Sequence, residues 1–407
     1  MAEKSNKSRK KKWIKTRHKI VRHTLGVFFR AYSRIKYGAR IKPFKEEGKR
    51  QYLVLFNHQT AFDQFFVGMA FKGPVYYMAS EDLFSNGFVS SIIRFLVAPI
   101  PIKKQTADVR AIMNCMRVAK EGGSISLAPE GNRTYSGKTE YMSPSIAPLA
   151  RKLALPIALY HIKGGYGVQP RWSDNVRRGK IDCYVSRVIE PEEYMSLTDD
   201  ELYELIKEGL YINEASADHS YKHERSAERL ERVLYYCPNC GFSTFDSAYN
   251  IVKCKKCKLW VRYLPTTELD GVGVDIPYHF VNDWYEAQNK FINSTDTTLL
   301  TEEPVWVDES SFSEVIPYKK KRIISEDCRV ELYGDRIQIS SKEVNEVFPF
   351  SDCTAVTVLG RNKVDIYHAD KIYQLKGGKS MNAIKYVHFY NRFKNISKGD
   401  SNEFLGL

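Results

Sequence analysis

The sequence contains no long hydrophobic run. Among its 407 residues, the best candidate is residues 89–102, which are interrupted by Arg94 and contain Pro99 and Pro101. A helix that crosses a bilayer needs about 18 or more apolar residues in a row, so we expect no membrane-spanning helix. The composition, with 43% hydrophobic and 27% charged residues, also excludes fibrous and broadly disordered proteins. The length suggests two or three domains.

Acidic residues are nearly absent from the first 45 positions. This segment holds 16 Lys or Arg residues and one acidic residue, Glu3, while the rest of the chain has 46 basic and 47 acidic residues. The net charge of +14 therefore belongs to an arm on a nearly neutral body. Such an arm suits an anionic membrane surface or a nucleic acid.

The arm has the spacing of an amphipathic helix. Lys and Arg residues alternate with apolar residues that recur at intervals of three, four and seven: Ile14, Val21, Leu25, Phe28, Tyr32 and Ile35. The pattern predicts a basic helix that lies in the bilayer interface. A helix docked on its own domain with its basic side solvated, or a contact with nucleic acid, are the alternatives.

We also expect neither a cleavable signal peptide nor a disulfide framework. Eight Cys residues are few for this length, and four of them lie within 21 residues. The clustered cysteines and the lack of a signal-peptide pattern together favour a reducing compartment. We therefore expect a cytoplasmic protein that binds peripherally to the inner face of the cell membrane.

Four cysteines have the spacing of a metal site. Cys237 and Cys240 form one Cys-x2-Cys pair, and Cys254 and Cys257 form another, with 13 residues between the pairs. Four thiolates predict a structural zinc ribbon without an open coordination position, whereas redox or disulfide chemistry is the weaker alternative. A zinc ribbon with a basic arm also makes a nucleic-acid-binding protein the rival for the whole chain. Basic and aromatic residues are not interleaved outside the arm, which argues against nucleic acid as a partner.

The catalytic candidates follow a short apolar run. Residues 52–56 are typical of a strand buried on both faces, and the run ends at Asn57 and His58, with Asp63 five residues after the histidine. Two side chains five apart on one helix point about 140° away from each other, so His58 must precede the helix for Asp63 to reach it. A carboxylate that orients one ring nitrogen leaves the other free to take a proton from a hydroxyl. Taken alone, the spacing fits a capping aspartate and an incidental histidine better.

A second loop changes this balance. Residues 125–137 predict another buried strand that ends in a glycine-containing loop, in which Glu130 and Arg133 stand three apart. An arginine in a loop is a natural fork for a phosphate group. The order and spacing of the two loops resemble the glycerolipid acyltransferases, the lysophosphatidate (1-acylglycerol-3-phosphate) acyltransferase family, over about residues 46–210.

The resemblance depends on four sequence blocks. The first, Asn-His-x4-Asp, and the third, Pro-Glu-Gly-Thr-Arg, match Asn57, His58, Asp63, Pro129, Glu130, Gly131 and Arg133. Asn132 stands where threonine is usual. Lys104 is the nearest equivalent of the arginine in the second block, and the fourth block keeps one proline, Pro156, of its usual two.

The resemblance implies an α/β fold, with a sheet flanked by helices, and an O-acyltransferase. The reaction would move a fatty acyl group from acyl-coenzyme A or acyl carrier protein to the free hydroxyl of lysophosphatidate in phospholipid synthesis, or of another lysolipid or hydroxyl acceptor. His58 would be the general base and Asp63 its orienting partner. The substrate would be bound by Lys104, Glu130, Gly131 and Arg133. Because thioesters are already activated, no cofactor is expected at this site.

The C-terminal third alternates short strand patterns with turns. The predicted strands, followed by a helix at 382–393, are residues 329–333, 336–340, 346–350, 354–359, 363–368 and 371–375. This pattern is similar to a pleckstrin-homology-like, mostly-β barrel domain. Such a domain implies binding of lipid headgroups or a protein partner, or packing against the catalytic domain.

Together the patterns divide the chain into six segments. In order, they are a basic arm (1–45), an acyltransferase domain (46–232), a zinc ribbon (233–264), a connector with one helix (265–320), a pleckstrin-homology-like β domain (321–397) and a tail (398–407).

Overall fold

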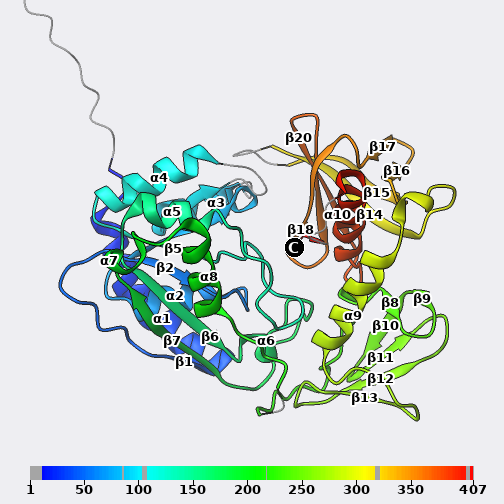
Figure 1. The fold of residues 1–407 in the computed structure, drawn as a ribbon, viewed down its shortest axis with the longest axis horizontal. Coiled ribbons are helices and arrows are strands. Elements are labelled where there is room, and N and C mark those ends of the chain that lie inside the picture. Colours follow the sequence, from blue (N-terminus) through cyan, green and yellow to red (C-terminus); the bar gives the residue numbers. More distant parts are fainter. Residues whose placement is uncertain are drawn as a thin grey trace, which may run out of the picture.

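The structure is a computed structural model that describes residues 12–84, 87–102, 108–216, 218–316, 321–399 and 404–406. Figure 1 shows an N-terminal part, coloured blue to green, and a second part, coloured light green to red, beside it. Lys104, the predicted second-block residue, lies outside the described residues.

The N-terminal part is built on a seven-stranded sheet with the order β1-β7-β6-β2-β5-β3-β4. Its neighbouring strands are parallel except for β6 and β7. The strands are β1 (Ala39–Ile41), β2 (Leu53–Phe56), β3 (Val75–Ser80), β4 (Ile100–Ile102), β5 (Ser124–Leu127), β6 (Ile157–Lys163) and β7 (Ile181–Ile189). The helices are α1 (Thr16–Tyr37), α2 (Asp63–Ala70), α3 (Phe88–Leu96), α4 (Val109–Lys120), α5 (Ile146–Leu153), α6 (Gly165–Val168), α7 (Pro191–Tyr194) and α8 (Asp199–Leu210).

Strand β2 lies between two layers of helices. Val54 and Phe56 belong to the core formed with α1 and α2, while Leu53 and Leu55 belong to the core formed with α4, α5 and α8. All four side chains are buried, which confirms the predicted α/β fold and the predicted strand. Because β2 and β5 are parallel neighbours, the loops that follow them leave the same edge of the sheet.

Helix α1 is docked on this domain, but not as an ordinary amphipathic helix. Arg22 and Arg30 donate hydrogen bonds to main-chain carbonyl groups at the end of α2, at 3.2 and 2.8 Å. By contrast, Val27 is 72% exposed and Ile35 is 85% exposed. Basic residues thus help to hold the helix to the domain, together with Phe29 and Tyr37, while part of its apolar side faces solvent. The alternative of a docked helix therefore holds in part: Lys19, Arg34 and Lys36 are exposed, whereas Arg22 and Arg30 face the domain.

The four-cysteine segment forms two small sheets. One is the hairpin of β8 (Tyr236–Cys237) and β9 (Gly241–Phe242). The other is an antiparallel sheet of β10 (Phe245–Ala248), β11 (Ile251–Cys254), β12 (Trp260–Tyr263) and β13 (Leu269–Gly271).

The C-terminal part is an antiparallel sheet with the order β17-β16-β15-β14-β20-β19-β18, followed by α10 (Ile384–Lys398). Its strands are β14 (Trp306–Val315), β15 (Arg322–Leu332), β16 (Arg336–Ser340), β17 (Asn345–Pro349), β18 (Cys353–Leu359), β19 (Lys363–His368) and β20 (Lys371–Gly377). This confirms a mostly-β C-terminal part. It differs from the prediction in β14, which lies in the predicted connector and pairs with both β15 and β20.

The ribbon, α9 (Val281–Ser294) and the C-terminal sheet share one hydrophobic core. Within it, His388 of α10 is hydrogen-bonded to the hydroxyl groups of Tyr235 and Tyr285, at 2.7 and 3.3 Å. Tyr135 and Trp172 of the N-terminal part belong to the same core. The C-terminal part is therefore packed against the α/β domain rather than tethered to it.

Candidate active site

His58 and Asp63 meet at the junction of β2 and α2. His58 lies in the loop after the strand, and Asp63 is the first residue of the helix. Nδ1 of His58 lies 2.8 Å from Oδ2 of Asp63. No described residue forms a hydrogen bond with Nε2 of His58, and the side chain is partly exposed. The imidazole therefore has one nitrogen held in place and one nitrogen available.

The carboxylate of Asp63 is fixed by the loop itself. It is fully buried and accepts hydrogen bonds from the backbone N–H groups of Gln59 (2.6 Å) and Thr60 (2.9 Å), and from the Thr60 hydroxyl (2.6 Å). Together with Nδ1 of His58, these groups surround the carboxylate with four hydrogen-bond donors. We therefore assign the ring proton of neutral His58 to Nδ1, which leaves Nε2 as the proton acceptor.

The surroundings of His58 favour its neutral form. Burial lowers the pKa of His58 below its ordinary value of 6.5, the hydrogen bond and charge of Asp63 oppose this change, and the positive charges of Arg133 and Arg171 add to it. A histidine that is neutral at pH 7 is in the form that a general base requires.

Glu130 connects the two loops. It follows β5, and its Oε1 accepts the backbone N–H of His58 at 2.8 Å, while Oε2 accepts that of Glu140 at 3.1 Å. Burial raises the pKa of Glu130 to about 8, although both backbone donors oppose this change. The hydrogen bonds of Glu130 therefore hold the backbone of the histidine loop.

Two further motif residues, Asn57 and Gly131, determine the course of the backbone around the site. Asn57 is buried and exchanges two hydrogen bonds with the main chain of Ile162, at 2.8 and 2.9 Å, which ties β2 to β6. Gly131 is exposed and has a φ of +68°, a left-handed conformation that favours glycine. This turn carries the loop from Glu130 toward Arg133.

Arg133 brings a positive charge close to His58. Its Nη1 is buried and has no hydrogen-bond partner. Burial, together with the positive charges of Arg171 and Arg361, lowers the pKa of Arg133 to about 10, so the guanidinium remains charged at neutral pH. A charged fork with a free N–H group is suited to bind an oxyanion such as phosphate.

Arg171 is a site residue that the sequence motifs did not identify. It is only 2% exposed, its Nη1 donates to the carbonyl of Arg133 at 2.8 Å, and its guanidinium lies 4.2 Å from the ring centre of Tyr135. Arg171 follows α6 and reaches the loop of Arg133 through the fold. It lies outside the four sequence blocks that carry the family resemblance.

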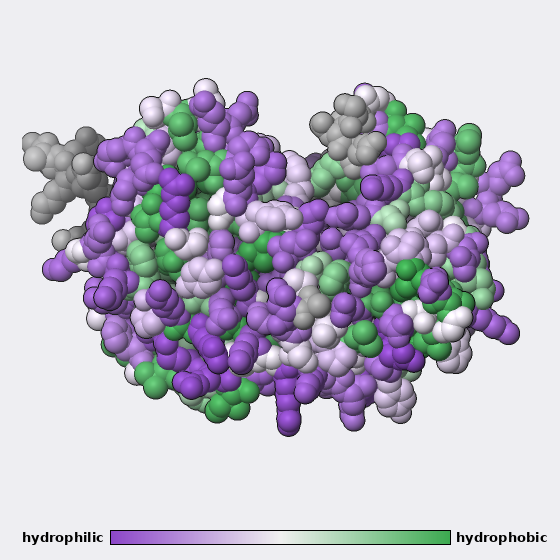
Figure 2. Space-filling model, turned by 60° about the horizontal axis from the view of Figure 1, so that its bottom comes forward, coloured by the Kyte–Doolittle hydropathy of each residue, from purple (hydrophilic) through white to green (hydrophobic). Residues whose placement is uncertain are grey.

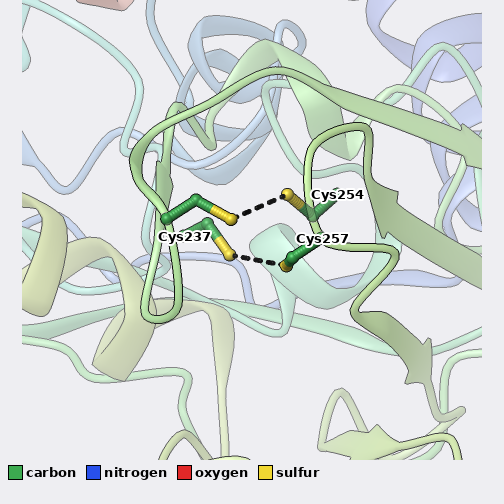
Figure 3. A group of neighbouring side chains, drawn as sticks. Cys237, Cys254 and Cys257 are labelled. Atoms are coloured by element: carbon green, nitrogen blue, oxygen red, sulfur yellow. Dashed lines mark hydrogen bonds between the residues drawn. The ribbon is translucent and has the colours of Figure 1, made fainter.

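The four predicted metal ligands also come together. Their sulfur atoms all lie within 4.8 Å of one another, and Figure 3 shows those of the labelled cysteines turned toward a common centre. The Sγ atoms of Cys237 and Cys257 are 3.6 Å apart, and those of Cys240 and Cys254 are 4.0 Å apart. A tetrahedral zinc ion with Zn–S bonds of about 2.3 Å places its sulfurs roughly 3.8 Å apart. The cluster therefore fits a tetrahedral metal ion such as zinc.

Comparison with known proteins identifies the domain that contains the His58–Asp63 pair. Residues 35–162 match the family model described as Acyltransferase, and this segment includes both residues as well as Glu130 and Arg133. The match agrees with the resemblance drawn from the motifs, and it is limited to this segment of the chain.

Two solved structures are similar to parts of the chain. The 1-acyl-sn-glycerophosphate (LPA) acyltransferase PlsC from Thermotoga maritima is 21% identical, with a TM-score of 0.41, and the match covers 47% of this chain and 78% of that one. The N-terminal PH domain of the human ARAP2 protein is 18% identical, with a TM-score of 0.18, and the match covers 22% of this chain and 82% of that one. No curated protein matches the chain.

Proposed function

We propose that this protein transfers a fatty acyl group from a thioester donor, acyl-coenzyme A or acyl carrier protein, to the free hydroxyl of lysophosphatidate. One observation carries the proposal: the His58–Asp63 pair presents an available Nε2, and the charge of Arg133, which has an unpaired guanidinium nitrogen, acts on this imidazole. The family match of residues 35–162 supports the class of reaction.

In the proposed mechanism, Nε2 of His58 takes the proton of the acceptor hydroxyl as its oxygen attacks the thioester carbonyl carbon. The tetrahedral intermediate then collapses, the carbon–sulfur bond breaks, and the leaving thiolate is protonated by His58, which returns to its neutral form. Asp63 stabilises the imidazolium between the two steps. Arg133 binds the phosphate of the acceptor and thereby holds the hydroxyl near Nε2. Glu130 and Gly131 shape the loop that carries Arg133.

We expect Arg133→Ala to weaken use of the acceptor more than use of the donor. A hydrogen bond to a charged group contributes about 1.5–3 kcal/mol, so the KM for lysophosphatidate should rise by about tenfold to a hundredfold. The KM of Arg133→Lys for lysophosphatidate should lie between those of the wild type and Arg133→Ala, because lysine keeps the charge but not the planar fork. Steady-state kinetics with each substrate varied in turn measure both constants. An unchanged acceptor KM in Arg133→Ala would remove Arg133 from phosphate binding.

We also propose that α1 and α3 bring the site to an anionic membrane surface. Phe88 of α3 is 80% exposed, and Val27 and Ile35 of α1 are also largely exposed. The two helices are in contact, because Arg17 of α1 donates a hydrogen bond to the carbonyl of Phe95 on α3 at 2.8 Å. Figure 2 shows apolar side chains at the surface of the N-terminal part, on the left, among mainly hydrophilic ones. Within the described segments, no helix is both long enough and apolar enough to span a bilayer. The basic arm would add roughly 1 kcal/mol of binding for each Lys or Arg near anionic lipid.

The double variant Val27→Glu/Ile35→Glu should bind membranes less tightly. It removes two exposed apolar side chains and adds two negative charges, so partitioning onto vesicles of phosphatidylglycerol and phosphatidylcholine should fall by about tenfold or more. Co-sedimentation measures this, and wild-type binding should weaken as salt is raised. Leu299→Glu, at a residue that is 76% exposed in the second part of the chain, is the matched control. Equal binding by the double variant and the control would refute a membrane role for α1.

The ion held by the four cysteines is proposed to be zinc with a structural role. Four thiolate ligands leave no coordination position for a substrate. The ribbon also shares its core with α9 and the C-terminal sheet, so its loss would reach well beyond the cysteine loops.

A further inference from the structure

The turn between β18 and β19 brings the C-terminal sheet to the candidate active site. Figure 1 shows β18 on the side of that sheet that faces the N-terminal part. Arg171 links the two parts, because its Nε donates to the carbonyl of Gly360 in this turn at 3.1 Å, while its Nη1 donates to the carbonyl of Arg133. The next residue in the turn, Arg361, is therefore placed beside the loop that carries Arg133.

Arg361 shares its carboxylate partner with other arginines. Nη1 of Arg361 lies 3.1 Å from Oδ1 of Asp174, but the same carboxylate also binds Arg232 at 2.8 Å and lies 3.5 Å from Arg229. Arg229 also lies 3.7 Å from Glu228 and 3.5 Å from Glu231, whereas Arg361 and Arg232 share the carboxylate of Asp174.

The two arginines on the N-terminal side of the boundary between the two parts, Arg133 and Arg171, have no such partner among the described residues. Neither of them forms an ion pair with a carboxylate there. Nη1 of Arg133 and Nε of Arg361 are both buried without a hydrogen-bond partner. Buried donors that lack a partner are costly, and like charges held close together repel each other. A dianionic group bound here would relieve both costs.

We propose that Arg361 completes the phosphate-binding site that Arg133 and Arg171 begin, so that the phosphate of the acceptor is bound between the α/β domain and the C-terminal sheet. This inference rests on the proposed function and extends it. The ligand chemistry is a phosphomonoester dianion, which guanidinium groups bind through charge-assisted N–H donors; Nη1 of Arg133 and Nε of Arg361 are buried donors without a partner. It also gives the C-terminal sheet a role in selecting the acceptor: lysolipids with a terminal phosphate are preferred over neutral ones.

The kinetic test compares Arg361→Gln with the wild type, using lysophosphatidate and monoacylglycerol, which lacks the phosphate, as acceptors. We expect the KM for lysophosphatidate to rise about tenfold, as for the loss of one charge-assisted contact, with the KM for acyl-coenzyme A and for monoacylglycerol unchanged. Arg361→Lys should give an intermediate value, and it also tests the site if the glutamine variant does not fold. Arg322→Gln, at an exposed ion pair with Glu314 in the same sheet, should leave all constants unchanged.

Three results would overturn the inference. An unchanged KM for lysophosphatidate would remove Arg361 from the site. An equal rise for both acceptors would indicate that Arg361 only holds the two parts together. A rise in the donor KM alone would assign the arginines to a phosphate of coenzyme A instead.

A binding measurement separates this inference from the proposed function. Calorimetric titration with glycerol 3-phosphate needs no turnover, so it tests Arg361 even if the wild type transfers no acyl group. We expect about tenfold weaker binding by Arg361→Gln than by the wild type and Arg322→Gln. Equal affinity in all three proteins would exclude a phosphate contact by Arg361.

Discussion

Substitution of His58 with alanine should lower the rate of acyl transfer by about 10²–10⁴-fold, the usual contribution of a general base. The acceptor hydroxyl would have no group to take its proton, whereas donor and phosphate binding would remain. The rate is measured with saturating acyl-coenzyme A and lysophosphatidate. His279→Ala, at an exposed histidine in the second part of the chain, is the matched control and should keep wild-type activity. Normal turnover by a folded His58→Ala variant would refute the assigned base.

The pH profile gives this prediction a second readout. Only neutral His58 can act as the base, and burial lowers the pKa of His58 below 6.5. The kcat/KM of the wild type should therefore stay constant as pH falls through 7 and decline only below 6.5. Asp63 raises the pKa of His58, whereas the positive charge of Arg133 lowers it. Asp63→Asn should move the acid limb to lower pH as well as reduce the rate.

Loss of the metal site should have the largest effect on stability. Cys237→Ser removes one of four thiolate ligands, and structural zinc in small domains contributes about 10–16 kcal/mol of apparent binding free energy, which is comparable to the whole stability of a typical domain. We expect the purified variant to contain less than one zinc per chain and to unfold at a clearly lower temperature. Metal analysis by mass spectrometry and thermal unfolding measure these two quantities.

Cys353→Ser is the control for this experiment. Cys353 is buried in the same core but lies outside the cluster, so its substitution should lower stability while zinc stays bound. Purified wild-type protein that holds no metal and is as stable as the metal-loaded form would contradict a structural zinc site.

The sequence predicted those features that depend on neighbouring residues. β16 and β19 begin and end at the predicted positions, because short alternating runs bounded by turns define a strand locally. The four cysteines come together as their spacing indicated. His58 and Asp63 also meet as expected, since a strand, a loop and the first turn of a helix determine their distance.

Features that depend on packing could not be predicted from the sequence. The helical period of α1 identified an apolar face but not the side that the domain covers, and Val27 and Ile35 are exposed. β14 was assigned to a connector because its run of acidic and serine residues hides the buried positions Ser310 and Phe312. A polar central strand is recognised only through the neighbours that pair with it.

The arginine cluster shows the same limit at the site. Arg171 is separated by 38 residues from Arg133 and by 189 residues from Gly360, yet it is hydrogen-bonded to both. Motif spacing describes single loops, whereas this cluster combines a loop of the α/β domain, a segment after α6 and a hairpin of the C-terminal sheet. The residues proposed to select the acceptor are therefore those that the fold alone brings together.

The most direct test of the account is a thioester-release assay with purified wild-type protein. Long-chain acyl-coenzyme A and acyl carrier protein are each offered as donors, with lysophosphatidate beside other lysolipids as acceptors, and His58→Ala is measured in parallel. The account predicts release that requires an acceptor, is fastest with lysophosphatidate and is lost in the variant. Release that is independent of the acceptor, or that His58→Ala retains in full, would contradict it.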